Sequence, residues 1–219
     1  MFVLVACEES QRVCKAFRDK GHTAFSCDVI DASGGYPEWH IKQDVLPLLN
    51  GNCSFTTCDG KEHKIEQKWD MIIAFPPCTY LTCAGACRLY PTKGVMDMER
   101  YAKGVEARDF FMTIYNADCE KICIENPLPL KAFNLPPKTQ VIQPYQFGHP
   151  FSKRTLLWLK GLPKLEPTDV ITEGVVSWVN AGTKKANGER RSQVGVSHNA
   201  KDRSKTFEGI ASAMAQQWG

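Results

Sequence analysis

Asp70-Met71-Ile72-Ile73-Ala74-Phe75-Pro76-Pro77-Cys78-Thr79-Tyr80 is the most informative segment for the fold, because it joins an apolar run to a proline-rich loop. Its apolar run, Met71 to Phe75, has the length of a strand, and a continuous apolar run is typical of a parallel strand buried on both faces. Two prolines end the run, because neither can donate to a sheet ladder. Cys78 therefore follows the strand at its carboxyl end, where ligands of open α/β folds bind.

Cys78 is a candidate nucleophile, because a thiolate is strongly nucleophilic at neutral pH. The alternative is a small buried hydrophobic residue after a strand. A second stretch, Lys121-Ile122-Cys123-Ile124-Glu125-Asn126-Pro127, is another short apolar strand, and it ends in Glu-Asn-Pro. The pattern predicts a carboxylate at the same kind of strand end as the thiol.

The order of these motifs resembles the cytosine carbon-5 methyltransferase family, with its Pro-Cys nucleophile loop and its Glu-Asn-Val loop. More narrowly, the chain resembles short methyltransferase-like proteins of bacteriophages and prophages. The resemblance covers most of the chain. It implies an α/β fold with a doubly wound, mostly parallel sheet of the Rossmann-like, class I methyltransferase type. Residues 1–219 would form a single domain with a small β-hairpin insertion.

The resemblance also implies a chemistry, the methylation of carbon 5 of cytosine in DNA by S-adenosylmethionine. Cys78 would add to carbon 6 of the base, and Glu125 would protonate ring nitrogen 3. Arg154 matches an arginine that contacts the target pyrimidine, although the neighbouring Gln and Arg of that motif are missing. The loops on which these residues lie would place Pro77, Thr79 and Asn126 at the substrate and Pro76 at the cofactor.

The beginning of the chain predicts a βαβ unit for a nucleotide-like cofactor. Strands are expected at Phe2 to Ala6 and His22 to Cys27, with a helix from Glu9 to Lys20 between them. Asp28 stands where an acidic residue accepts hydrogen bonds from ribose hydroxyls; the alternative is a turn residue.

The turn after the first strand has no glycine, unlike the usual methyltransferase turn. Backbone amides around Ala6, Cys7 and Ser10 can still meet the cofactor, with Ser10 capping the helix. By resemblance, Asp44 would bind the adenine amino group, and its alternative is a helix cap before Leu46.

Two further segments are predicted from local patterns. Residues 50–68 alternate apolar and polar side chains around Asp59-Gly60, which predicts a β-hairpin insertion. A zinc site there, built from Cys53, Cys58 and His63, is not expected, because the paired spacing of zinc ligands is absent. Amphipathic helices are expected at residues 97–116 and 206–218.

The second half of the chain carries the predicted substrate contacts. Gln143, Tyr145 and His149 lie in a proline-rich loop that is suited to stacking on a base, or to packing over the sheet edge. Residues 166–205 are polar and basic, and they read as a reduced target-recognition segment that tracks a phosphate backbone, or as a solvated loop.

Composition restricts the class of protein and the cellular compartment in which it is expected. The chain has 219 residues, 43% of them hydrophobic, and a net charge of +3. No apolar run reaches the roughly 18 residues of a membrane helix, and the N-terminus reads as a strand, not a signal peptide. Ten cysteines, several within apolar patterns, favour a reducing cytoplasm. The resemblance implies that this is the cytoplasm of a bacterial or phage-infected cell.

Two alternatives stay open. The same chemistry on RNA or a free pyrimidine nucleotide would suit the short recognition segment. A degenerate, non-catalytic methyltransferase fold that binds nucleic acid or a protein would suit the glycine-free turn.

Overall fold

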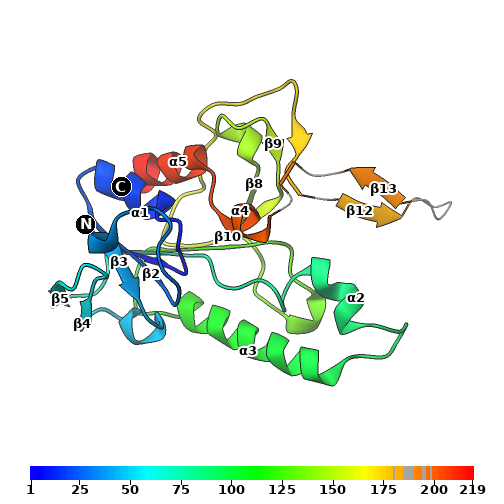
Figure 1. Cartoon of the computed structure of the whole chain (residues 1–219), viewed down its shortest axis with the longest axis horizontal. Helices are drawn as coiled ribbons and strands as arrows, with labels where there is room; N and C mark the ends of the chain where they lie inside the picture. The colour runs from blue at the N-terminus through cyan, green and yellow to red at the C-terminus, as the bar shows by residue number, and fades with distance from the viewer. Residues whose placement is uncertain (180, 185–189, 194–195, 198) are drawn as a thin grey trace.

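The computed structural model describes residues 1–179, 181–184, 190–193, 196–197 and 199–219 (Figure 1). In chain order, its strands and helices are β1 (Phe2–Ala6), α1 (Arg12–Asp19), β2 (Thr23–Asp28), β3 (His40–Lys42), β4 (Cys53–Thr56), β5 (Glu62–Ile65), β6 (Met71–Ala74), α2 (Ala86–Leu89), α3 (Met98–Tyr115), β7 (Ile122–Asn126), β8 (Gln140–Ile142), β9 (Phe151–Ser152), β10 (Thr155–Lys160), β11 (Val176–Ser177), β12 (Ala181–Lys184), β13 (Arg190–Gln193), α4 (Ala200–Ser204) and α5 (Glu208–Trp218).

A seven-stranded sheet organises the fold, in the order β3-β2-β1-β6-β7-β10-β8. The first five strands of this order pair in parallel. β10 runs antiparallel to both of its neighbours, β7 and β8. The prediction of an α/β fold with a mostly parallel sheet is confirmed, and this strand arrangement is compatible with a Rossmann-like fold. The order reverses between β1 and β6, where the chain has crossed from one half of the sheet to the other.

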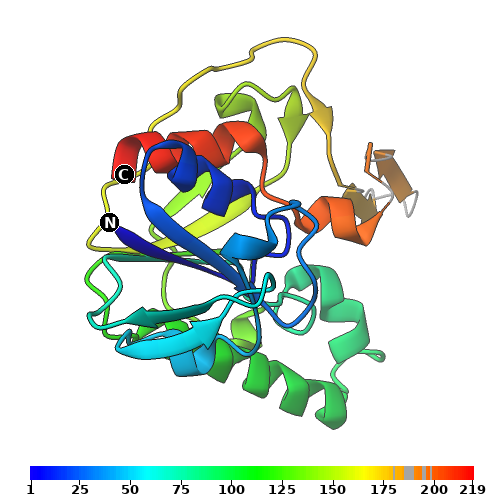
Figure 2. The same ribbon diagram turned by 60° about the vertical axis from the view of Figure 1, so that its left-hand side comes forward.

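Helices cover both faces of the sheet. α1 and α5 lie side by side over one face, while α3 and the hairpin of β4 and β5 lie under the other (Figures 1 and 2). Each central strand therefore needs apolar side chains on both sides. Val3 and Val5 face the core beneath α1 and α5, and Leu4 faces the core above α3. This explains why the strands read as unbroken apolar runs.

The predicted elements lie close to their expected positions, with a few differences. α1 begins at Arg12 and not at Glu9, because the chain first makes a tight turn after β1. β4 and β5 pair antiparallel across a turn that contains Asp59 and Gly60, and Phe55 and Ile65 anchor this hairpin in the core.

The loop after Cys78 carries short helical turns that sequence patterns did not predict. They lead into α2 and pack in a separate apolar cluster around Leu81, Leu89 and Phe133. Phe133 lies against Gly104 of α3, where any side chain would collide with its ring. The segment after β7 is thereby held against α3.

All ten cysteines are free. Across the described ranges, no helix is both long and apolar enough to cross a membrane. In the same residues, no group of three or more His, Cys, Asp or Glu side chains is arranged to hold a metal ion. At the hairpin, Cys58 is exposed and the Nε2 of His63 lies 3.1 Å from the Thr57 hydroxyl.

Candidate active site

A cavity of about 370 Å³ opens at the carboxyl ends of β1, β2, β3 and β6. This is the place where the strand order reverses, which is where open α/β sheets bind ligands. Its lining includes, among others, Cys7, Glu8, Glu9, Ser10, Asp28, Val29, Gln43, Asp44, Phe75, Pro77, Lys205 and Thr206. Four of these side chains are carboxylic acids, so the cavity has an acidic wall.

The turn between β1 and α1 forms one side of the cavity without a glycine. Cys7 and Gln11 have φ angles of 58° and 57°, a left-handed conformation that glycine adopts more easily. The Glu8 carboxylate accepts hydrogen bonds from the amides of Val13 at 2.7 Å and Cys14 at 3.1 Å. The Glu8 carboxylate therefore accepts the free main-chain amides in the first turn of α1, which is the role predicted for Ser10. The N-cap residue itself is Gln11. Ser10 lines the cavity, and Ala6 is buried directly before this turn.

Glu8 and Glu9 differ in their surroundings. Glu8 is 3% exposed, and burial raises its pKa to about 7 despite the two amide hydrogen bonds. Both carboxyl oxygens of Glu9 are buried, and neither has a hydrogen-bond partner among the described residues. A buried carboxylate without a partner is unfavourable. Glu9 is therefore a group that a cationic or hydrogen-bond-donating ligand would satisfy.

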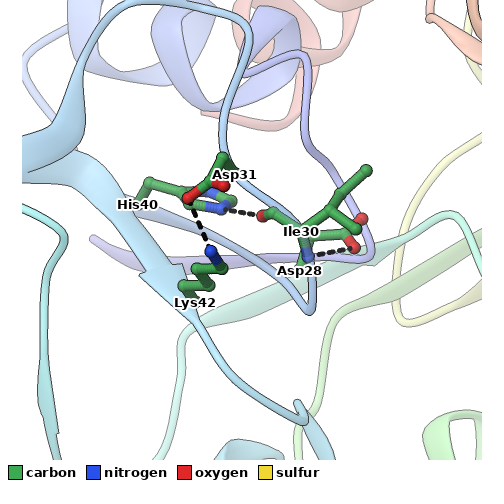
Figure 3. A network of polar contacts seen from close by, with 5 residues as sticks. All are labelled: Asp28, Ile30, Asp31, His40 and Lys42. Atoms are coloured by element: carbon green, nitrogen blue, oxygen red, sulfur yellow. Dashed lines mark hydrogen bonds and ion pairs between the residues drawn. The ribbon is translucent and has the colours of Figure 1, made fainter.

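Asp28 stands at the end of β2, where a small polar network shapes the loop after the strand (Figure 3). Its Oδ1 accepts the amide of Ile30 at 3.3 Å, and the Ile30 carbonyl lies 2.9 Å from the Nε2 of His40. Asp31 pairs with Lys42 at 2.8 Å on the exposed side (Figure 3). Burial raises the pKa of Asp28. Asp28 is thus a turn residue that also lines the cavity.

Asp44 makes the capping contact that was its alternative role, and it also lies in the wall of the cavity. Its Oδ1 accepts the amide of Leu46 at 3.1 Å at the start of a short 3₁₀ turn. The residue is exposed and lines the cavity beside Asp28. Two aspartates from neighbouring strand ends therefore share one wall.

Cys78 and Glu125 come from neighbouring strands and meet at the same edge of the sheet. β6 and β7 are paired with Ala74 beside Ile124, so both chains leave the sheet at that edge. Both residues are half-buried. Burial raises the pKa of the Cys78 thiol, and the nearby carboxylate of Glu125 raises it further. Burial also raises the pKa of Glu125.

Asn126 connects the two loops. It is fully buried, and its Nδ2 donates a 3.1 Å hydrogen bond to the carbonyl of Pro76. Its Oδ1 is buried and has no hydrogen-bond partner in the described part of the chain. Pro76 is buried, while Pro77 and Thr79 are exposed. The Thr79 carbonyl accepts a 2.9 Å hydrogen bond from Arg100 of α3, whose guanidinium also lies over the Tyr80 ring.

The cation beside Glu125 is Lys153, which sequence reasoning missed. Lys153 and Glu125 line one small cavity of about 10 Å³, whereas Arg154 is exposed and does not line it. The Lys153 ammonium lowers the pKa values of Glu125 and Cys78, against the larger effect of burial. The side chains of successive residues in an extended chain point in opposite directions. The basic pair in the sequence therefore indicates that one of the two side chains turns inward, but it does not indicate which one.

The predicted substrate loop is tied to other parts of the chain. The Oε1 of Gln143 accepts the amide of Lys153 at 2.9 Å. The Nε2 of His149 accepts the amide of Gly209 at 2.9 Å, and its ring packs against Phe207. Tyr145 is half-buried. Gln143 and His149 are thus held by contacts within the fold, to the residue before β10 and to the start of α5.

The predicted target-recognition segment, residues 166–205, contains β11, β12, β13 and α4. Lys185, one of its basic residues, lies outside the described residues, as do the side chains of Lys184, Arg190, Arg191 and Lys201. Its last residues reach the site, because Ser204 lines both the large cavity and the small one beside Glu125, and Lys205 lines the large one.

Comparison of the chain with protein-family models and with curated proteins returns no match.

Proposed function

We propose that this protein is an S-adenosylmethionine-dependent methyltransferase that acts on carbon 5 of cytosine in DNA. One observation carries the proposal. Cys78 comes after β6 and Glu125 lies at the end of the paired strand β7, near enough for the Glu125 charge to raise the pKa of the thiol, and the adjacent Pro77 lines the acidic cavity at the switch point of the sheet. A nucleophile, a proton donor and a cofactor-sized cavity are thus neighbours.

The side chains that line the cavity are complementary to S-adenosylmethionine. The methyl donor carries a positive sulfonium, a positive ammonium and ribose hydroxyl groups. Glu9, Asp28 and Asp44 offer carboxylates to such groups, and Glu9 lacks any other partner among the described residues. Val29 is exposed at the cavity directly after Asp28, and Phe75 lines it from the β6 side, so apolar surface is available for an adenine ring. When bound, the cofactor supplies an electrophilic methyl group.

Cys78 and Glu125 would make the cytosine reactive toward that methyl group. Carbon 5 of the base is a weak nucleophile. A Cys78 thiolate that forms a bond to carbon 6 shifts an electron pair toward carbon 5 and ring nitrogen 3. Glu125 in its protonated form donates its proton to nitrogen 3, and its raised pKa favours that form. Once carbon 5 carries the methyl group, its proton would pass to water, the bond between Cys78 and carbon 6 would break to release the thiolate, and the nitrogen 3 proton would return to Glu125, which restores the aromatic ring.

The substrate must enter by opening the site. The cavity beside Glu125 has a volume of about 10 Å³, which is room for about one water molecule. A pyrimidine ring is much larger, and in a duplex it must also leave the base stack. Binding therefore has to move residues around Thr206 or the loop of Cys78.

The direct test is methyl transfer from labelled S-adenosylmethionine to cytosine-containing DNA. Cys78→Ser is expected to abolish transfer, while Cys83→Ser, an exposed cysteine of the same loop, keeps it. DNA with 5-fluorocytosine should trap a covalent adduct with Cys78, because fluorine cannot leave carbon 5 as a proton does. Transfer that persists in Cys78→Ser would refute the role of the thiol.

A free nucleotide and single-stranded RNA, assayed beside DNA, separate the substrate classes. Calorimetry with S-adenosylmethionine tests the non-catalytic alternative. Asp28→Asn should weaken binding, whereas Asp31→Asn, an exposed residue three positions away, should not. No measurable binding to the unmodified protein would contradict the cofactor assignment.

A further inference from the structure

We propose that Lys153 is a positioning residue for Cys78 and Glu125. The ammonium of Lys153 stabilises one net negative charge on these two side chains, so that Cys78 can be a thiolate while Glu125 carries a proton. This inference rests on the proposed function, because that chemistry needs both forms at the same time.

The position of Lys153 follows from strand register. β10 runs antiparallel to β7, with Leu157 beside Glu125 and Leu156 beside Asn126. The residues just before β10 therefore lie beyond the carboxyl end of β7, where the Cys78 loop also leaves the sheet. Lys153 faces inward and lines the cavity of Glu125.

A distant segment fixes the ammonium in this place. The Nζ of Lys153 donates a 2.8 Å hydrogen bond to the carbonyl of Arg203, in α4. The main-chain amide of Lys153 donates to the Oε1 of Gln143 at 2.9 Å. Both ends of the residue are thus held by parts of the chain that are remote from the thiol. The adjacent Arg154 is exposed and does not share the cavity.

The role of Lys153 follows from the charges that lie beside it, those of the Cys78 thiol and the Glu125 carboxyl. Two acids that lie close together do not readily ionise together, since each charge opposes the other. One cation beside them favours a single shared negative charge. Among the described residues, the charged groups facing Cys78 are Glu125 from β7 and Lys153 before β10, and Arg100 of α3 reaches the neighbouring Thr79 carbonyl. The proton that leaves the thiol can therefore reside on Glu125.

The test is the rate at which Cys78 is alkylated by iodoacetamide between pH 6 and pH 10, with no DNA and no methyl donor. Mass spectrometry of the tryptic peptide of residues 69–88 resolves Cys78 from Cys83 and Cys87, which are exposed internal controls. Lys153→Met should move the Cys78 profile to higher pH. The rate near pH 8 should fall by about tenfold, the factor that corresponds to one pKa unit.

Four further variants sharpen the result. Arg154→Met should change the Cys78 rate by less than about twofold, because exposed charges interact weakly through water. Lys153→Arg should keep most of the rate. Glu125→Gln should raise it by removing the like charge, and Lys153→Met in that background should still lower it, which separates the cation from any change in Glu125.

Two outcomes would overturn the inference: a Cys78 profile that Lys153→Met leaves unchanged, or an equal shift in Arg154→Met. The buried Cys14 and Cys123 report on folding, because they react only if the chain opens. If Lys153→Met exposes them, Lys153→Gln decides the question, since it lacks the charge but keeps a donor for the Arg203 carbonyl. If Lys153→Met shifts the Cys78 profile but the unmodified protein transfers no methyl group, the role of Lys153 is supported and the proposed function is rejected. If methyl transfer occurs but the profile does not shift, only the role of Lys153 is rejected.

Discussion

Glu8→Gln is predicted to change how the stability of this protein depends on pH. Glu8 is 3% exposed, and its carboxyl accepts the amides of Val13 and Cys14 at the start of α1. Burial raises its pKa from an ordinary value of 4.5 to about 7, and the neighbouring Glu9 adds to the effect. The folded protein therefore holds the Glu8 proton more tightly than the unfolded chain does.

The sign follows from this difference. Below pH 4.5 Glu8 is protonated in both states, and its contribution to stability is complete. As the pH rises toward 7, the unfolded chain ionises first, so the free energy of unfolding falls. The gap between 4.5 and about 7 corresponds to about 3 kcal/mol. Glutamine does not ionise, so Glu8→Gln should gain about 3 kcal/mol relative to the unmodified protein between pH 4 and pH 8.

Urea denaturation followed by circular dichroism measures this quantity at each pH. The quantity to compare is how the difference in the free energy of unfolding between variant and unmodified protein changes with pH. The loss of one amide hydrogen bond in glutamine shifts this difference by the same amount at every pH. Glu62→Gln, an exposed residue of β5, is the matched control and should show a flat difference. A flat difference for Glu8→Gln would refute the reasoning. It would mean that the two amides and the helix terminus stabilise the charge as well as water does.

Three further predictions concern single residues. Cys7→Gly should relieve the left-handed φ of 58° and raise the free energy of unfolding by about 1 kcal/mol, measured by urea denaturation. Gly104→Ala places a Cβ 2.1 Å from the Phe133 ring and should destabilise by roughly 1–3 kcal/mol, since overpacking exceeds the gain in helix propensity. His149 has a pKa lowered by burial, and its Nε2 accepts the Gly209 amide. The contribution of His149 to stability should therefore fall as the pH drops below the ordinary histidine value of 6.5, and His149→Gln should remove that contribution from the pH dependence.

Matched variants check each of these expectations. Gln11→Gly also relieves a positive φ, but it removes two side-chain hydrogen bonds to Tyr36 and should destabilise. Phe133→Leu in the Gly104→Ala background should recover part of the lost stability. A Gly104→Ala protein as stable as the unmodified chain would contradict the close fit. Unchanged acid sensitivity in His149→Gln would show that other groups control it.

The β6 and β7 strands were predictable because their signals are local. An isoleucine-rich run ended by Pro76 and Pro77 can form only a short buried strand, and the stretch that ends in Asn126 and Pro127 behaves in the same way. Parallel strands bring their carboxyl ends to one edge of the sheet. The place of Cys78 after one such strand, and of Glu125 at the end of the other, could thus be predicted from the sequence before any contact was known.

Other assignments needed the folded molecule. Ser10 has the residue type of a helix cap, yet Glu8 takes the amides of α1, because the tight turn at Cys7 brings its carboxylate under the helix. His149 has the side chain of a base-reading residue, yet it accepts the amide of Gly209, sixty residues away. Patterns of neighbouring residues carry no information about such partners.

The strands, their mostly parallel sheet and the two side chains at its edge could be predicted from the amino-acid sequence, because backbone sterics and apolar runs act over a few residues. Which of two adjacent basic residues turns toward these side chains depends on contacts made only in the folded molecule. The Lys153 side chain points inward, where the carbonyl of Arg203, fifty residues away in the chain, accepts its ammonium, while Arg154 is left to the solvent.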